Sequence, residues 1–285
     1  MSGDYIVLLG TKGGPSQRPD SSKPTSNLYM LDGTPIVVDC GLGVTHGLTG
    51  QGIALRDLSL IFITHLHADH YLELGPLIHT AWTSGLKTPI DMYGPPGLAS
   101  YWANFLEAMR ADIDLRIVDD GRRDIRDLVR FHAVAPGEVM ARDGLTVHAL
   151  RTQHPPMADC FAYSFRTSHT HVVYSGDTAP LAALAEFARG ADLLIHEAML
   201  VEALPALMAK LGDTEGTLQA RLLRVHSPAQ DAAAIAAQAG VKALAFSHLI
   251  PSDDPNFSQA EWREAAKGIY DGPLHIGHDG LRIDL

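Results

Sequence analysis

One segment of six residues restricts what this chain can fold into more than any other. It reads His65-Leu66-His67-Ala68-Asp69-His70 and directly follows residues 58–63, an apolar run whose length and β-branched residues predict a buried strand. Ordinary core packing cannot satisfy four ligand-type side chains in six residues, because a buried polar group without a partner costs free energy. Four side chains also crowd a single tetrahedral metal site that must leave room for water. The segment therefore favours two metal ions over one.

Further ligand-type side chains follow other predicted strands. A catalytic site with two metal ions needs about six or seven ligands, and sites in open α/β sheets gather at the carboxyl ends of strands. Three more candidate ligands each come after a predicted strand: His154 after residues 145–150, Asp177 after residues 172–174 and His248 after residues 243–246. Their common position predicts that they converge on the segment 65–70.

The composition of the chain limits the class of protein and the partners that are compatible with this site. A chain of 285 residues with 46% hydrophobic and 19% charged residues can bury a sizeable core. Its net charge of −11 argues against broad attraction to nucleic acid or anionic membranes. The two cysteines, Cys40 and Cys160, form no disulfide framework and are too few for a zinc-cysteine site. No segment resembles a signal peptide or a membrane span, so we expect a cytoplasmic protein without a membrane partner.

The remaining pattern predicts one α/β domain over residues 1–285. A hairpin is expected over residues 28–38, with Gly33 in its turn, and strands and helices alternate afterwards. Apolar residues from Leu98 to Met109 recur at helical spacing. Capping signals predict that two further helices start at Ser227 and Ser258.

The order of the ligand motifs resembles that of the metallo-β-lactamase fold hydrolases. The resemblance rests on the segment 65–70, on His154, on Asp177 within Ser-Gly-Asp-Thr, and on the late His248, and it extends over nearly the whole chain. It implies a four-layer αβ/βα sandwich, in which helices flank two central mixed sheets. It also implies two divalent metal ions at one edge, with Zn²⁺ expected and Mn²⁺ or iron as alternatives.

The resemblance further implies a role for each ligand. The seven residues divide into two sets that share a bridging carboxylate: His65, His67 and His154 for the first ion, Asp69, His70 and His248 for the second, and Asp177, with a hydroxide, between them. Redox di-iron relatives carry Glu at the position of His67, so this histidine is typical of the hydrolytic members. Asp69 would also hold the proton of the nucleophile.

Two more motifs are similar to those of one branch, the tRNase Z enzymes. Residues 196–199 (His-Glu-Ala-Met) and 226–228 (His-Ser-Pro) resemble the HEAT and HST motifs, although Met199 and Pro228 replace threonines. In that branch the second histidine assists the leaving group and the glutamate orients it. The resemblance therefore implies that His226 is a general acid and Glu197 its partner. A histidine at a helix start can instead cap or pack, and this alternative stays open.

The tRNA-binding arm of that branch is missing from this sequence. The arm lies between the positions that match His154 and Asp177, where this chain has only the 22 residues 155–176. That length suffices for two strands and a turn. Together with the acidic net charge, the missing arm favours a small ester over nucleic acid as the substrate.

The sequence thus predicts a dinuclear metal hydrolase that acts on a small phosphodiester or a related ester. The alternatives are a carboxylic ester or lactone hydrolase, an arylsulfatase, a tRNA 3′-processing endonuclease and, last, a non-catalytic binding protein. A homodimer is also left open. Tyr71 and Trp82 are candidates for the rim of the site, with core packing as the alternative for Trp82. A third aromatic residue, Phe257, is a candidate to close over a substrate, with a place in a surface loop as the alternative.

Overall fold

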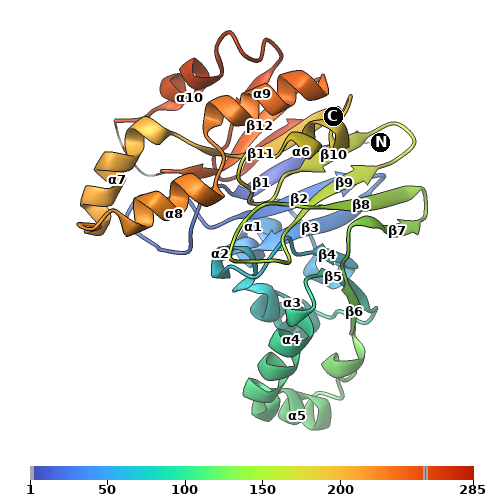
Figure 1. The fold of residues 1–285 in the computed structure, drawn as a ribbon. Coiled ribbons are helices and arrows are strands. Elements are labelled where there is room, and N and C mark those ends of the chain that lie inside the picture. The colour runs from blue at the N-terminus through green and yellow to red at the C-terminus, as the bar shows by residue number, and fades with distance from the viewer. Residues whose placement is uncertain (1–2, 253, 255) are drawn as a thin grey trace.

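Two seven-stranded sheets form the centre of the computed structural model, which describes residues 3–252, 254 and 256–285 (Figure 1). The strands of the first sheet are, in spatial order, β14 (Leu281–Asp284), β1 (Tyr5–Gly10), β2 (Ser26–Leu31), β3 (Thr34–Cys40), β4 (Leu60–Phe62), β5 (Ile90–Gly94) and β6 (Val129–Ala133). Those of the second sheet are β13 (Leu274–Ile276), β12 (Leu244–Ile250), β11 (Leu193–Met199), β10 (His171–Tyr174), β9 (Phe161–Arg166), β8 (Leu145–Arg151) and β7 (Gly137–Arg142).

The two sheets pack face to face through buried apolar side chains from both. Aromatic rings lie within this layer, where Phe62 of the first sheet makes edge-to-face contacts with Tyr163 and Phe165 of the second, at 5.5 and 5.2 Å between ring centroids. Rings in this geometry attract one another beyond the gain from burial alone.

Helices cover the outer face of each sheet. The first sheet carries α1 (Val44–Gly50), α3 (Leu74–Thr83), α4 (Gly97–Ala108) and α5 (Arg110–Asp119), and the second carries α6 (Ala182–Phe187), α9 (Ala229–Ala239) and α10 (Gln259–Ala266). Short 3₁₀ turns lie at Leu55–Asp57, Ile125–Asp127 and Val201–Ala203. The predicted four-layer sandwich is therefore confirmed, whereas its description as one domain stays a prediction.

Three further helices lie near one end of the sandwich. The single turn α2 (Ala68–Tyr71) follows β4, and α7 (Leu204–Leu211) and α8 (Thr217–Val225) form a helical hairpin after β11 (Figure 1). The strands β3 and β4 run parallel, as do β10, β11 and β12, so the carboxyl ends within each group lie side by side. No helix in the described part of the chain is long and apolar enough to cross a membrane.

Most of the expected elements are present, with two informative differences. The hairpin of β2 and β3 is confirmed, and so are the helix over 98–109, which is α4, and the capping box at Ser258. Ser227 does not cap α9, which begins at Ala229, because its buried hydroxyl donates to the carbonyl of Thr178 at 2.7 Å. The strand β12 extends to Ile250, so His248 lies within the strand rather than after it.

Candidate metal centre

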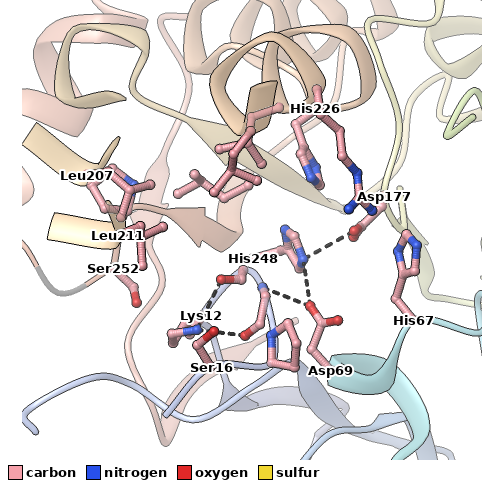
Figure 2. Close-up of a pocket in the computed structure, with 18 of the residues that line it drawn as sticks. Lys12, Ser16, His67, Asp69, Asp177, Leu207, Leu211, His226, His248 and Ser252 are labelled. Atoms are coloured by element: carbon pink, nitrogen blue, oxygen red, sulfur yellow. Dashed lines mark hydrogen bonds and ion pairs between the residues drawn. The ribbon is translucent and has the colours of Figure 1, made fainter. Parts of the chain in front are cut away.

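The structure brings the seven predicted ligand side chains to one place between the two sheets. Donor atoms of His65, His67, His154 and Asp177 all lie within 4.8 Å of one another, and those of Asp69, His70 and His248 form a second such group. The loop after β4 and α2 supplies four of them, and the ends of β8, β10 and β12 supply the others. Figure 2 shows how Asp69, Asp177 and His248 point toward one another.

The first group consists mainly of neutral imidazoles. Nε2 of His65 and Nε2 of His154 lie 3.0 and 3.1 Å from Nδ1 of His67. Burial lowers the pKa of all three rings, that of His67 to about 4, because the charged form loses hydration. Near pH 7 these rings therefore present lone pairs, which is the form in which histidine binds metal ions.

Two buried polar atoms lie where the first group of ligands meets the second. Nε2 of His70 and Oδ1 of Asp177 are buried without a hydrogen-bond partner among the described residues, and they lie 3.4 Å apart. Burial opposes ionisation of Asp69 and Asp177, but the surrounding histidines outweigh it and hold both pKa values well below their usual range. Buried anions and unpaired polar atoms are costly, and cations bound between them would remove that cost. These residues therefore fit a dinuclear metal site.

A bulge in β12 directs His248 into this group. In the pairing with β11, Ser247 lies opposite Glu197 and Leu249 opposite Ala198, so His248 has no partner residue. Its φ of 46° is in the left-handed region, where a bulged residue turns its side chain out of the regular alternation. Nε2 of His248 thereby lies 3.3 Å from Asp69 and 3.2 Å from Asp177.

Asp39, which the sequence analysis missed, orients His70. This buried residue at the end of β3 lies with Oδ2 2.7 Å from Nδ1 of His70. Its carboxylate also accepts hydrogen bonds from the backbone N–H and the hydroxyl of Thr64. Burial opposes protonation of His70, but the carboxylates of Asp177, Asp39 and Asp69 outweigh it and raise the pKa of His70. A proton held on Nδ1 directs Nε2 toward the second ligand group. The sequence signal that could have identified Asp39 is an aspartate at the end of an apolar strand.

The loop between β1 and β2 contacts the second group of ligands through its backbone. The backbone N–H of Gly14 donates to Oδ2 of Asp69 at 2.8 Å. Gly13 donates to the carbonyl of Leu249, and a Cβ on Gly13 would lie 2.9 Å from the ring of His248. Only glycine therefore lets this loop approach the ligands so closely.

Glu197 and His226 form a buried pair beside the ligands. Oε2 of Glu197 lies 2.8 Å from Nδ1 of His226, and Oε1 accepts a hydrogen bond from the backbone N–H of Thr178 at 2.5 Å. Burial raises the pKa of Glu197 and lowers that of His226, because the charged form of each side chain loses hydration. His196, in contrast, points away from the site and lies with Nδ1 2.7 Å from the carbonyl of Glu197.

A cavity of about 320 Å³ adjoins both ligand groups (Figure 2). Its lining includes His67, Asp69, Asp177 and His226 on one side and leucines of α7 and α8 on the other. The three aromatic candidates do not line it. Trp82 is buried in the core under the first sheet, Tyr71 packs edge-on against Tyr101, and Phe257 packs against the core of the second sheet.

Comparisons with known proteins agree with this architecture. The sequence model of a family described as "Anti-Pycsar protein Apyc1" matches residues 5–247. A "Ribonuclease Z" from Mycobacterium bovis (strain BCG / Pasteur 1173P2) is 31% identical over 286 positions, which cover 98% of either chain. The structure of YhfI from Bacillus subtilis, a metallo-β-lactamase fold protein, matches over 100% of both chains at 23% identity, with a TM-score of 0.71. The short form of human tRNase Z matches over 98% of both chains at 22% identity, with a TM-score of 0.70.

The hydrogen bond from His70 to Asp39 predicts an effect on metal affinity. The substitution Asp39→Asn keeps the size of the side chain but removes the charge that holds the His70 proton on Nδ1. We expect the affinity for Zn²⁺, measured by competition with a chelator, to fall roughly 10- to 100-fold while the circular dichroism spectrum is unchanged. Asp91→Asn is the matched control, because Asp91 is also a buried, hydrogen-bonded aspartate but lies on β5 outside the site. Equal zinc affinity in Asp39→Asn and the control would contradict this role.

Proposed function

From the membership of this chain in the Apyc1 family and in the ribonuclease Z-like branch of the metallo-β-lactamase fold hydrolases, we propose that it hydrolyses a small phosphodiester. The chain is a metal-dependent hydrolase that acts on ester bonds. The size of its substrate and the roles of its site residues are what we propose here.

The cavity is the observation that carries the proposal of a small substrate. Its volume of about 320 Å³ lies at the lower end of the range for small-molecule sites. Three cationic side chains line it although the chain as a whole has a net charge of −11: Lys12, Arg18 and Arg221. Such a site suits one anionic group with one attached substituent, whereas a polynucleotide is held by contacts along an extended basic surface.

The seven ligands define the chemistry that we assign to the site. We propose that they hold two Zn²⁺ ions, because imidazole nitrogens and carboxylate oxygens are ligands that zinc prefers. When bound, the ions supply Lewis acidity, which lowers the pKa of water and neutralises charge on the ester oxygens. Gly14 fixes the orientation of Asp69, so Oδ1 of this carboxylate is available to accept the proton of the attacking water.

The pair of Glu197 and His226 can supply a proton to the leaving group. Because Nδ1 of His226 faces Glu197, Nε2 is the ring atom that can donate toward the cavity. The departing oxygen takes up this proton as its bond to phosphorus breaks, and the pair is left with one negative charge. The backbone N–H of Thr178, which donates to Glu197, stabilises that charge.

A second candidate substrate is an RNA, and the names of the relatives favour it. Because relatives that cover 98% of this chain are called ribonuclease Z, the expectation that a small ester is favoured over nucleic acid has no support from them. A local feature of the chain favours the small substrate. Residues 155–176 contain the strands β9 and β10 and short connections, without an inserted arm.

A panel of substrates distinguishes these functions. Zinc-loaded protein is assayed with bis(p-nitrophenyl) phosphate, p-nitrophenyl sulfate, a lactone and a tRNA precursor. We expect kcat/KM for the phosphodiester to exceed the others by orders of magnitude, and His65→Ala, Asp177→Ala and metal-depleted protein to be inactive although folded. A higher value for the tRNA precursor would establish the second candidate. A higher value for the lactone, or full activity without metal, would refute phosphodiester hydrolysis.

The role of His226 can be tested through the leaving group. A poor leaving group such as an alkoxide needs a proton, whereas p-nitrophenolate leaves without one. We expect His226→Ala to lower kcat roughly 10²- to 10⁴-fold for a diester with an alkyl alcohol as leaving group, and much less when p-nitrophenol leaves. The exposed His46 of α1 supplies the control substitution, His46→Ala, which should change neither rate. Equal losses for both leaving groups would show that His226 acts in another way.

A further inference from the structure

Lys12, in the loop between β1 and β2, lines the cavity and yet is only 1% exposed. A lysine is rarely buried to this extent, because its ammonium group loses hydration. Its backbone is held on both sides, since the N–H donates to the carbonyl of Lys23 at 3.0 Å and the carbonyl accepts from the hydroxyl of Thr25 at 3.2 Å. The chain therefore places this cation beside the ligand groups in a defined position.

The ammonium of Lys12 binds the two carbonyl groups that follow it in the chain. Nζ donates to the carbonyl oxygen of Gly14 at 2.6 Å and to that of Gly13 at 3.2 Å. The Gly13 carbonyl belongs to the same peptide group as the N–H of Gly14, which donates to Oδ2 of Asp69 at 2.8 Å. The ammonium and the carboxylate thus lie at opposite ends of one peptide group. Figure 2 shows Lys12 and Asp69 on either side of this part of the loop.

This arrangement strengthens the hydrogen bond to Asp69. A positive charge at the carbonyl oxygen draws electron density from the peptide group and makes its N–H a better donor, as in other chains of linked hydrogen bonds. The effect is largest where water is excluded, and the side chains of Lys12 and Asp69 are both buried. Oδ2 of Asp69 therefore accepts a hydrogen bond that a full charge supports.

The flanking glycines make this support necessary. Gly13 and Gly14 have no side chains, and the φ of Gly14 is 86°, so rotation of the peptide group between them meets little steric resistance. The rotated peptide would direct its carbonyl oxygen, instead of its N–H, toward the carboxylate of Asp69. Lys12 opposes this rotation, because its ammonium would lose the Gly13 carbonyl.

Direct binding of a substrate oxygen is the alternative role for Lys12, since this residue lines the cavity. An ammonium has three N–H bonds, and Lys12 directs two of them to the carbonyls of Gly13 and Gly14. A ligand that displaced these carbonyls would leave polar groups of the loop without partners, which is costly. The contacts therefore favour a positioning role, in which the charge of Lys12 acts on the cavity only at a distance.

We propose that Lys12 is a positioning residue: through the peptide group between Gly13 and Gly14, it holds Asp69 in the orientation that binds the second metal ion. With Oδ2 held by Gly14, Oδ1 of Asp69 stays available for the proton of the attacking water. This last part of the inference rests on the proposed phosphodiester hydrolysis, whereas the positioning of Asp69 can be measured without a substrate.

Nuclear magnetic resonance of the zinc-loaded protein tests the peptide group directly. Gly13 and Gly14 form the only Gly–Gly pair in the sequence, so glycine labelled with ¹⁵N and with ¹³C at the carbonyl carbon gives one HNCO signal. That signal reports the Gly13 carbonyl and the Gly14 N–H together. We expect Lys12→Met to move the carbonyl carbon and the amide proton upfield, because the hydrogen bond of the first is lost and that of the second is weakened. If Lys12→Met does not fold, Lys12→Gln, which keeps only a neutral donor, should show shifts in the same direction.

Zinc affinity and kinetics separate positioning from direct binding. In Lys12→Met we expect the affinity for Zn²⁺, measured by competition with a chelator, to fall roughly tenfold. For bis(p-nitrophenyl) phosphate at saturating Zn²⁺, kcat should also fall roughly tenfold while KM stays nearly unchanged, because Asp69 and not the substrate loses support. A rise in KM at unchanged kcat would show that Lys12 binds the substrate, and the proposal would then be wrong.

Lys23 supplies the matched control. It lies in the same loop, is exposed and does not line the cavity. Lys23→Met should leave the HNCO signal, the zinc affinity and kcat unchanged. An unchanged signal in folded Lys12→Met, or equal changes in the two variants, would overturn the proposal. If the signal and the zinc affinity change in Lys12→Met while no diester is hydrolysed, the positioning of Asp69 stands and only the proposed function fails.

Discussion

The carboxylate of Asp177 connects the two halves of this molecule. It follows β10 in the second sheet, and its oxygens lie 3.7 Å from His65 and 3.4 Å from His70, both of which follow β4 in the first sheet. It also lies 3.2 Å from His248 on β12. An anion at this depth is tolerated only where cations or donors surround it. The positions of the two sheets therefore have to agree with the geometry of the site.

The rest of the fold meets this requirement by rigid packing. Aromatic rings between the sheets hold the distance between β4 and β9, and the glycines of the loop before β2 let that loop contact both Asp69 and β12. Asp39 orients His70 through its Nδ1, and the hydroxyl of Thr64 donates to the same carboxylate. The α7–α8 hairpin, with its own small apolar core, then closes one side of the cavity. The ligand groups belong to the two sheets and their loops, and leucines of the hairpin line the cavity beside them.

Most of the metal ligands were predictable from the sequence, because each lies in one short segment or directly after a predicted strand. The segment 65–70 and the residues after β8 and β10 identify themselves by residue type and by their position after an apolar run. Asp39 was missed because its contact with His70 joins residues 31 positions apart, and one aspartate after a strand has many other uses. The bulge that turns His248 inward depends on pairing between β11 and β12. The lining of the cavity by leucines of α7 and α8 was not predictable either, because their spacing is that of any amphipathic helix.

The central claim is that these seven residues hold two metal ions with Asp177 between them. Crystals of zinc-loaded protein, measured at the zinc absorption edge, test it directly. The account predicts two anomalous peaks roughly 3.5–4 Å apart, one beside His65, His67 and His154 and the other beside Asp69, His70 and His248. A single peak, or peaks away from these side chains, would contradict it.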